Sequence, residues 1–154
     1  MKKNYALQRI GILTLVSLAI AIINGYFFNY INNKYFHFSS NGNNLNDFSF
    51  TSQFIIIILF APLIETALLQ FIPNEILKYL KIYQPFLLVL IPSLLFSMLH
   101  YYNWIYVVMT FGGGLILNYY YIKAQNITKN IFYSFLLTAL LHSLYNLYGF
   151  LFVV

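Results

Sequence analysis

The sequence predicts an all-α fold: a polytopic integral membrane helix bundle of about five transmembrane helices, with its amino terminus inside. Three observations lead to this prediction. The 154 residues are 61% hydrophobic and only 7% charged, which is too little charge to cover a water-exposed surface. Several apolar runs approach the length that a bilayer requires. Seven of the eight basic residues fall on the same predicted side, as the positive-inside rule asks.

The first predicted helix covers about residues 10–30. It follows a basic segment at residues 2–9, as the apolar part of a signal peptide would, but its apolar and aromatic residues continue for a full span. Residues 31–51 are rich in asparagine and serine and are predicted to form a polar external loop, with His37 as an interfacial residue. Residues 1–51 are therefore predicted to form one segment, a membrane helix with its loop.

Four further helices are predicted at about residues 53–72, 85–100, 104–122 and 131–154. Polar segments at residues 73–81 and 123–130 are predicted to connect them. Pro92 should kink the third helix, because proline lacks the N–H group of the helical ladder. The glycines at 112–114 are interpreted as a close contact between helices, since the sequence of a phosphate-binding loop does not follow them.

The composition also bears on the function classes. Without cysteine, the chain has no disulfide framework, no thiolate nucleophile and no thiolate metal site. The net charge of +5 comes from scattered basic residues rather than from a basic cluster. Membrane topology explains that charge better than nucleic-acid binding, so the predicted surroundings are a lipid bilayer and no nucleic-acid partner is expected. Nothing in the sequence indicates the oligomeric state.

Glu65 is the residue around which a function can be built. It lies in the second predicted helix, shortly after the apolar run at residues 54–60. An ionised carboxylate inside a membrane is energetically costly and is a functional candidate by default. The other two acids, Asp47 and Glu75, lie in polar segments. The partners of Glu65 within the membrane should therefore mark the site.

Three further polar side chains in the predicted helices are candidate partners: His100, His142 and Asn146. Phe96 precedes His100 by four residues and Asn146 follows His142 by four, so each pair shares one helical face. Taken singly, each histidine would more often be a packing residue, and Asn146 could simply bridge two helices. Because these groups lie on separate helices together with Glu65, they are predicted to meet in a common interior.

This set of side chains suits the hydrolysis of an amide bond. Glu65 could take a proton from a water molecule that His100 also holds. His142 and Asn146 could donate hydrogen bonds to the oxyanion of a tetrahedral intermediate. The alternative use of the same residues is an open divalent-metal site with Glu65 and the two histidines as three ligands. The helical two-histidine zinc motif with an internal glutamate is absent from the sequence.

These residues resemble three motifs of the CPBP family of intramembrane endopeptidases, which contains the CAAX prenyl proteases and bacterial bacteriocin-processing and self-immunity proteins. The family's Glu-Glu-x-x-x-Arg, Phe-x-x-x-His and His-x-x-x-Asn motifs are similar to Glu65–Gln70, Phe96–His100 and His142–Asn146. The resemblance covers about residues 54–150 and identifies residues 52–154 as a CPBP-like intramembrane protease core.

The resemblance also implies roles for single residues. Glu65 would be the base, His100 would share its water, and His142 with Asn146 would stabilise the oxyanion, with Phe96 in support. It further implies a mechanism that depends on glutamate and has no obligatory metal or other cofactor.

The chain departs from the family pattern at two positions. The second glutamate and the arginine of the first motif are Thr66 and Gln70 here. Losing both partners of a buried ion pair can be nearly neutral, whereas losing one would strand a charge. The paired change is interpreted as a tolerated swap in which Thr66 and Gln70 could hydrogen-bond to each other, or as an early stage of catalytic decay.

The function predicted from these observations is an intramembrane endopeptidase of a bacterial cell membrane, acting on a peptide or membrane-protein substrate. The alternative is a weak or inactive family member that serves as a bacteriocin self-immunity or membrane interaction protein. A small transporter using Glu65 is a third hypothesis. Counted from the inner ends of their helices, His142 and His100 lie about 18 and 23 Å deep at 1.5 Å per residue. Helix tilt or the Pro92 kink is therefore needed if they are to meet Glu65.

Overall fold

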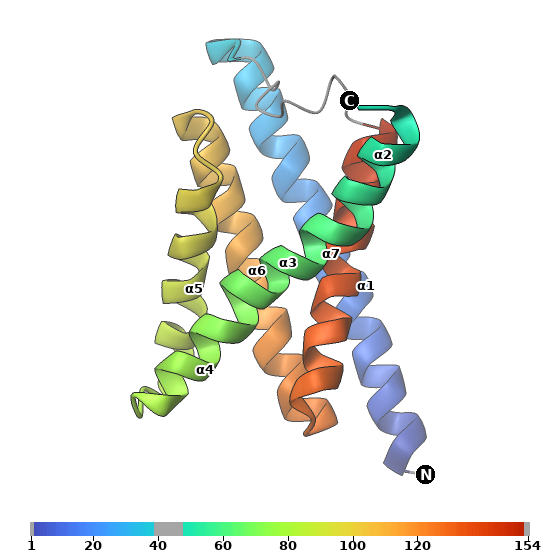
Figure 1. Cartoon of the computed structure of the whole chain (residues 1–154), viewed down its shortest axis with the longest axis vertical. Helices are drawn as coiled ribbons and strands as arrows, with labels where there is room; N and C mark the ends of the chain where they lie inside the picture. Colours follow the sequence, from blue (N-terminus) through green and yellow to red (C-terminus); the bar gives the residue numbers. More distant parts are fainter. Residues whose placement is uncertain (1, 39–47, 153–154) are drawn as a thin grey trace.

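The structure, a computed structural model, describes residues 2–38 and 48–152, and all of its regular elements in these ranges are helices (Figure 1). In chain order these are α1 (Lys2–Ile31), η1 (Asn32–Phe36), α2 (Phe50–Ile55), η2 (Ile56–Phe60), α3 (Ala61–Thr66), η3 (Ala67–Phe71), α4 (Ile72–Tyr79), α5 (Pro85–Leu99), α6 (Trp104–Thr128) and α7 (Ile131–Phe152). The three η segments are wider, π-helical turns. The predicted all-α fold is confirmed. Residues 39–47 of the predicted loop and residues 153–154 of the predicted last helix lie outside the described residues.

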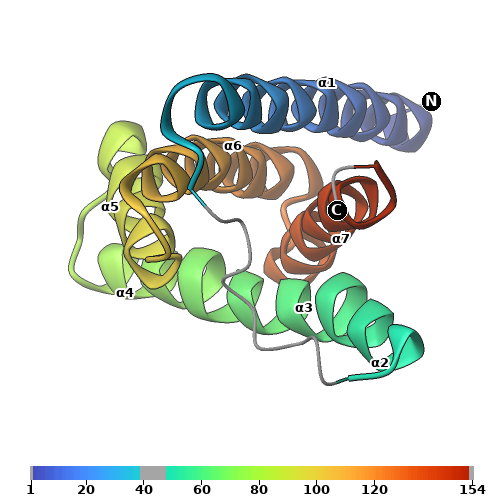
Figure 2. The ribbon, with the colours of Figure 1, turned by 90° about the horizontal axis from the view of Figure 1, so that it is seen from above.

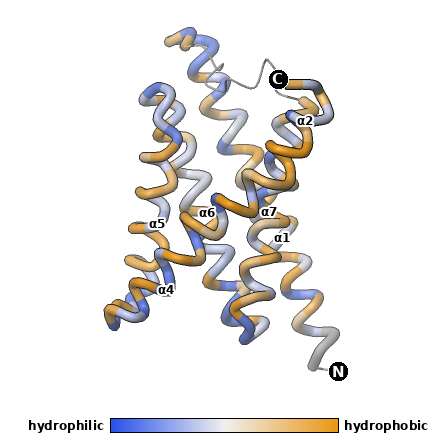
Figure 3. Tube along the Cα trace, in the orientation of Figure 1, coloured by the Kyte–Doolittle hydropathy of each residue, from blue (hydrophilic) through white to orange (hydrophobic). Residues whose placement is uncertain are grey.

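Within the described residues, four continuous helices are long and apolar enough to cross a membrane, namely residues 5–36, 50–79, 104–128 and 131–152. α5 is apolar but has only 15 residues, or about 22 Å, against a hydrocarbon core of about 30 Å. Apolar residues occur along all of these helices (Figure 3), and many large apolar side chains are exposed on the outside of the bundle. This is the pattern of an integral membrane protein, whose outer surface faces lipid rather than water.

The central helix of the bundle is α6, which packs against α1, α5 and α7 (Figure 2). The continuous helix of residues 50–79 runs diagonally across the other helices (Figure 1). Its first part, η2 and α3, contacts α7, and its last part, η3 and α4, contacts α5. The tilt of this one helix therefore joins the two helices that carry the candidate histidines.

Four predicted boundaries are wrong, and in each case the helix is longer than expected; the first of them is the start of α1, at Lys2 instead of about residue 10. Residues 32–36 continue the first helix, residues 73–79 form α4, and residues 123–128 end α6. The polar side chains that suggested loops at 73–79 have partners inside the bundle, as Asn74 does with Asn118 at 3.3 Å. Polarity indicates a loop only where the side chain finds no partner in the helix bundle.

Pro62 and Pro73 lie in the same position relative to a π-helical turn. The N–H of Ala61 donates to the carbonyl of Ile56, five residues earlier, just before Pro62. The N–H of Ile72 likewise donates to Ala67, just before Pro73. Each proline therefore follows a widened turn, which accommodates its ring without ending the helix. The carbonyl that would pair with the missing proline N–H is left free.

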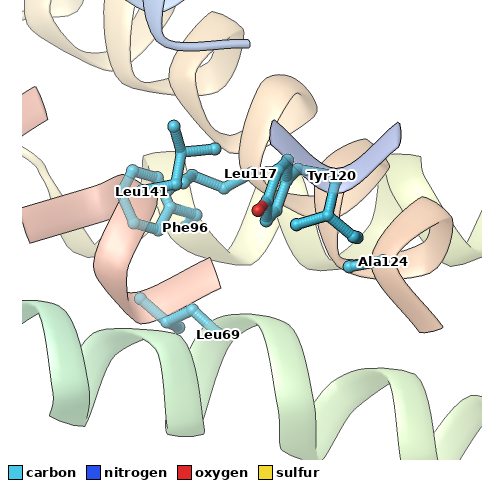
Figure 4. Packing of buried hydrophobic residues seen from close by; sticks show 7 residues of the cluster. Leu69, Phe96, Leu117, Tyr120, Ala124 and Leu141 are labelled. Carbon is cyan, nitrogen blue, oxygen red and sulfur yellow. The ribbon is translucent and has the colours of Figure 1, made fainter. Parts of the chain in front are cut away.

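Buried apolar side chains from five elements form the core between α6 and its neighbours (Figure 4). These residues are Ile10, Leu69, Phe96, Leu117, Tyr120, Ala124 and Leu141. Leu69 comes from η3 and Phe96 from α5, close to the candidate site residues of both segments. The core thus holds in place the helices from which the site is built.

The first helix is fixed to α6 by hydrogen bonds and by close packing. Thr14 Oγ1 lies 2.7 Å from the hydroxyl of Tyr120, and Asn24 Nδ2 donates to the carbonyl of Met109 at 2.9 Å. A Cβ atom on Gly112 would lie 2.5 Å from Asn24 Oδ1, so a larger residue there would displace this amide. Gly114 similarly lies against the backbone of Ser93 on α5. The predicted packing role therefore holds for Gly112 and Gly114.

Candidate active site

Glu65 lies on α3 and points toward both candidate histidines. Its Oε2 atom is 3.5 Å from Nε2 of His100 and 3.6 Å from Nε2 of His142. The side chain of Glu65 is 29% exposed, whereas that of His142 is only 5% exposed. The predicted meeting of three separate helices is therefore present, and the tilt of residues 50–79 makes it possible.

His100 lies at the end of α5, and a hydrogen bond at its Nδ1 atom fixes the orientation of its ring. Its Nδ1 atom is 2.7 Å from the carbonyl oxygen of Phe96, one turn earlier. Because a carbonyl can only accept, this hydrogen bond assigns a proton to Nδ1. When the ring is neutral, Nε2 carries a lone pair and faces the Glu65 carboxylate. Two acceptors that lie this close can be bridged by a water molecule, which donates one of its two O–H groups to each.

Phe96 holds both imidazole rings. Its ring stacks on His100 with centroids 4.3 Å apart, and it meets His142 edge to face at 5.7 Å. Phe96 is itself buried in the core. The four-residue spacing seen in the sequence therefore places an apolar support against the histidine pair, while the backbone of the same residue orients His100.

His142 differs from His100 at Nδ1, the ring nitrogen that does not face Glu65. The ring is buried on α7, and its Nδ1 atom has no hydrogen-bond partner. Nothing therefore holds the proton on Nδ1, and the Nε2 that faces Glu65 is free to carry it. A neutral His100 thus offers an acceptor at Nε2, whereas His142 can offer a donor at Nε2.

Asn146, one turn after His142, ties α7 to the kinked helix. Its Nδ2 donates to the carbonyl of Ile57 at 3.0 Å. In the widened turn, the N–H of residue 62 would donate to the carbonyl of Ile57, five residues earlier. Pro62 has no N–H group, so this hydrogen bond cannot form. The side chain thus satisfies a carbonyl that the proline leaves free. An amide NH₂ group has two hydrogens, so one remains for another acceptor.

Thr66 and Gln70 are completely buried next to Glu65. The hydroxyl of Thr66 and both polar side-chain atoms of Gln70 have no hydrogen-bond partner. The interpretation that these residues could hydrogen-bond to each other is therefore wrong. Their side chains lie where the family motif carries a second glutamate and an arginine, and the substituted residues leave polar atoms without partners in the interior.

A second polar group in the interior was missed by the sequence reasoning. Asn74 Nδ2 donates to Asn118 Oδ1 at 3.3 Å, and Asn118 Nδ2 donates to Ser93 Oγ at 3.2 Å. All three side chains are fully buried, and we call this group the amide ladder. Asn118 stands in the middle of a predicted apolar span, and that was the signal that could have found it.

A cavity of about 90 Å³ opens beside the site. His100, His142 and Asn146 line it together with apolar side chains of α1, α5, α6 and α7. Glu65 is not among its lining residues. The cavity therefore adjoins the two histidines and Asn146 rather than the carboxylate.

The structure gives no support to the alternative of a divalent-metal site in the residues that it describes. In the parts of the chain that the structure describes, no group of three His, Cys, Asp or Glu side chains is placed to hold a metal ion. Because Glu65 and the two histidines do not form such a group, the chemistry below is derived from the side chains alone.

Fold and site together define a class of protein: a polytopic membrane helix bundle in which one carboxylate faces two histidines. A family model described as "Type II CAAX prenyl endopeptidase Rce1-like" matches residues 47–148, about two-thirds of the chain. The chain belongs to this family, whose fold is that of a CAAX-type intramembrane protease, and the resemblance found in the motifs is confirmed. Comparison with curated proteins and with solved structures gives no match. The matched range holds all four predicted catalytic residues and leaves out α1.

Proposed function

We propose that this protein is an intramembrane endopeptidase of a bacterial cell membrane that hydrolyses a peptide or protein substrate at the bilayer. The observation that carries the proposal is the convergence of His100 Nε2 and His142 Nε2 on one oxygen of Glu65, at 3.5 and 3.6 Å. Membership of an intramembrane protease family supports it. The family's name refers to prenylated substrates, but the proposal names only a peptide bond near the membrane.

In the proposed reaction, Glu65 acts as the base and His100 helps to hold the water. Glu65 takes a proton from the water as its oxygen adds to the substrate carbonyl. The Nε2 lone pair of His100 accepts the second O–H group of the same water. When the C–N bond breaks, the proton held by Glu65 passes to the leaving amine, and Glu65 returns to its starting state.

His142 and Asn146 would stabilise the oxyanion that forms during this step. The Nε2–H of His142, which at 3.6 Å from Glu65 Oε2 is beyond hydrogen-bond distance, and the second amide hydrogen of Asn146 are the donors proposed for the oxyanion. Preorganised donors of this kind commonly contribute about 10²–10³ in rate. The positions of these groups near Glu65 support different roles for the two histidines. His100 would bind the water, and His142 would bind the carbonyl oxygen of the substrate.

The first test compares new peptide amino termini in membrane and secreted fractions of cells making the native protein or its variants. Glu65→Gln should abolish the product, because the amide cannot take the proton, and His142→Ala should lower its yield strongly. Glu75→Gln is the matched control, since Glu75 forms an ion pair with Lys78 at 2.6 Å at the edge of the bundle. Identical profiles for native and Glu65→Gln proteins, with normal membrane insertion, would overturn the peptidase proposal.

A second candidate function is a weak or inactive family member that acts in self-immunity or in binding a membrane partner. The unpartnered polar atoms of Thr66 and Gln70 favour it, because they stand where the family carries a charged pair. The double variant Thr66→Glu with Gln70→Arg separates the two hypotheses. A decayed enzyme should gain Glu65-dependent cleavage in this variant, whereas an active enzyme should cleave at a similar rate with and without it.

A further inference from the structure

The cavity beside the two histidines has a composition unlike that of the site itself. Most of its walls are apolar, and they include Phe96, Met109, Ile116, Leu117 and Leu141. The polar groups that line it are His100, His142 and Asn146 of the proposed catalytic machinery, together with Tyr106, Thr110 and Tyr145. A group that occupies the cavity is therefore next to the reacting atoms but is surrounded by hydrocarbon.

Gly113 keeps this cavity open. Unlike Gly112 and Gly114, which pack against Asn24 and Ser93, Gly113 has no atom within 4 Å of the position of an added Cβ. It lines the cavity from α6. The middle glycine of the three is thus the one that does not serve helix packing, and the predicted packing role does not apply to it.

The opposite wall comes from outside the segment that matches the family. Ala21 of α1 lines the cavity and is buried. The neighbouring Asn24 holds α1 to α6 by donating to the carbonyl of Met109, which also lines the cavity. Residue 21 has a small side chain and residue 113 has none. These two positions therefore determine the size of the cavity between α1 and α6.

We propose that this cavity is a specificity pocket for one unbranched or γ-branched apolar side chain of the substrate, such as leucine or methionine, next to the bond that is cut. The inference rests on the proposed function. An apolar cavity of about 150 Å³ accommodates benzene, so about 90 Å³ suits a smaller group of this kind. With the substrate carbonyl against His142 and Asn146, an adjacent side chain reaches the cavity that both residues line. Gly113 and Ala21 then determine the size of the side chain that is accepted.

The test uses fluorogenic peptides in proteoliposomes, in which each position next to the scissile bond is in turn Gly, Ala, Val, Leu, Met, Phe or Asp. The native protein should prefer Leu or Met at one position by about tenfold or more over Gly, and should reject Asp there. Gly113→Ala should shift the preference toward Val, and Gly113→Leu should shift it to Gly or Ala. Ala21→Leu should act in the same direction as Gly113→Leu.

Two matched controls separate the pocket from general effects of size on a membrane helix. Gly149→Leu adds the same side chain on α7, where an added Cβ also meets open space, but residue 149 does not line the cavity. Ala19→Leu changes an exposed position of α1, two residues from Ala21. Both controls should keep the native preference. A native preference that survives in Gly113→Leu, while cleavage still depends on Glu65, would overturn the pocket.

A binding experiment decides the pocket if no peptide is cut. Peptides carrying photo-leucine at each position are irradiated with the Glu65→Gln protein, and crosslinks are mapped by mass spectrometry. Crosslinks to α6 around Gly113 that disappear in the Glu65→Gln, Gly113→Leu protein support the pocket even if the peptidase proposal has failed. Crosslinks that are absent from α6, or that the Gly113→Leu change leaves intact, contradict it.

Discussion

The bundle contains two groups of polar side chains that differ in almost every physical respect. Glu65, His100 and His142, the acid–histidine cluster, face one another at 3.5–3.6 Å, and Glu65 is 29% exposed. The amide ladder of Asn74, Asn118 and Ser93 is fully buried and joined by hydrogen bonds. The ladder also satisfies backbone groups, since Asn118 Nδ2 donates to the carbonyl of Gly114 at 3.0 Å.

The difference shows how a membrane interior separates structural from reactive polar groups. In the ladder, amide donors meet acceptors directly and join α4, α5 and α6, and Asn74 Oδ1 is the one ladder atom left without a partner. In the acid–histidine cluster, the distances exceed the 2.7–2.9 Å of a charge-assisted hydrogen bond, and one buried nitrogen has no partner. Changes in the cluster should therefore affect activity, and changes in the ladder should affect stability.

After the loss of cleavage expected for Glu65→Gln, the largest effect is that of His142→Leu on catalysis. Loss of an oxyanion donor should lower the rate of peptide cleavage about 10²–10³-fold. The free energy of unfolding should stay the same or rise, because the change removes a buried Nδ1 without a partner. Initial rates in proteoliposomes and thermal unfolding in detergent measure the two effects. A large loss of stability would show that His142 is a structural residue like those of the ladder.

The next effect concerns the carbonyl that Pro62 leaves free. Pro62→Ala restores an N–H that can pair with Ile57, so Asn146 should lose its anchor and the cleavage rate should fall about tenfold. Pro73→Ala is the matched control, because Pro73 follows η3 as Pro62 follows η2. Rates of Pro62→Ala, Asn146→Ala and the double variant form a cycle. Additive effects would contradict the coupling, which should be about 1 kcal/mol.

Asn118→Leu tests the ladder itself. The change removes donors to Ser93 and Gly114 and an acceptor for Asn74, so the protein should lose about 1–2 kcal/mol of unfolding free energy. Cleavage by the folded fraction should be unaffected. Asn126→Leu, at an exposed position of the same helix, should change neither quantity. If Asn118→Leu instead abolished cleavage without lowering stability, the division between the two groups would be wrong.

The smallest effect is expected at the edge of the bundle, where Lys78 meets Glu75 at 2.6 Å and Gln125 at 2.8 Å. Partly exposed ion pairs contribute little, so Lys78→Met should lower the unfolding free energy by about 0.5 kcal/mol. Salt should reduce this difference further. Unfolding measured at low and high ionic strength checks both points. An effect above about 2 kcal/mol would place Lys78 in the structural interior with the ladder.

The sequence predicted which side chains meet inside the bundle better than it predicted the ends of the helices. Four-residue spacings in Phe96–His100 and His142–Asn146, with a lone intramembrane Glu65, were enough to name the residues that meet. The amide ladder could not be found in the same way. Asn74 follows a proline in a polar segment, and only its contact with Asn118 on another helix distinguishes it from a loop residue.

Hydropathy and local spacing are properties of single helices, and they determined by themselves that the chain is a membrane bundle with a carboxylate and two histidines inside. Only the tertiary structure decided how those helices are placed relative to one another. The tilt of residues 50–79 brings Glu65 to both histidines. Nδ1 of His100 meets the Phe96 carbonyl, whereas Nδ1 of His142 has no partner, and Ala21 lines a cavity together with Gly113. Contacts between helices depend on packing and on shared hydrogen bonds, which no one segment encodes.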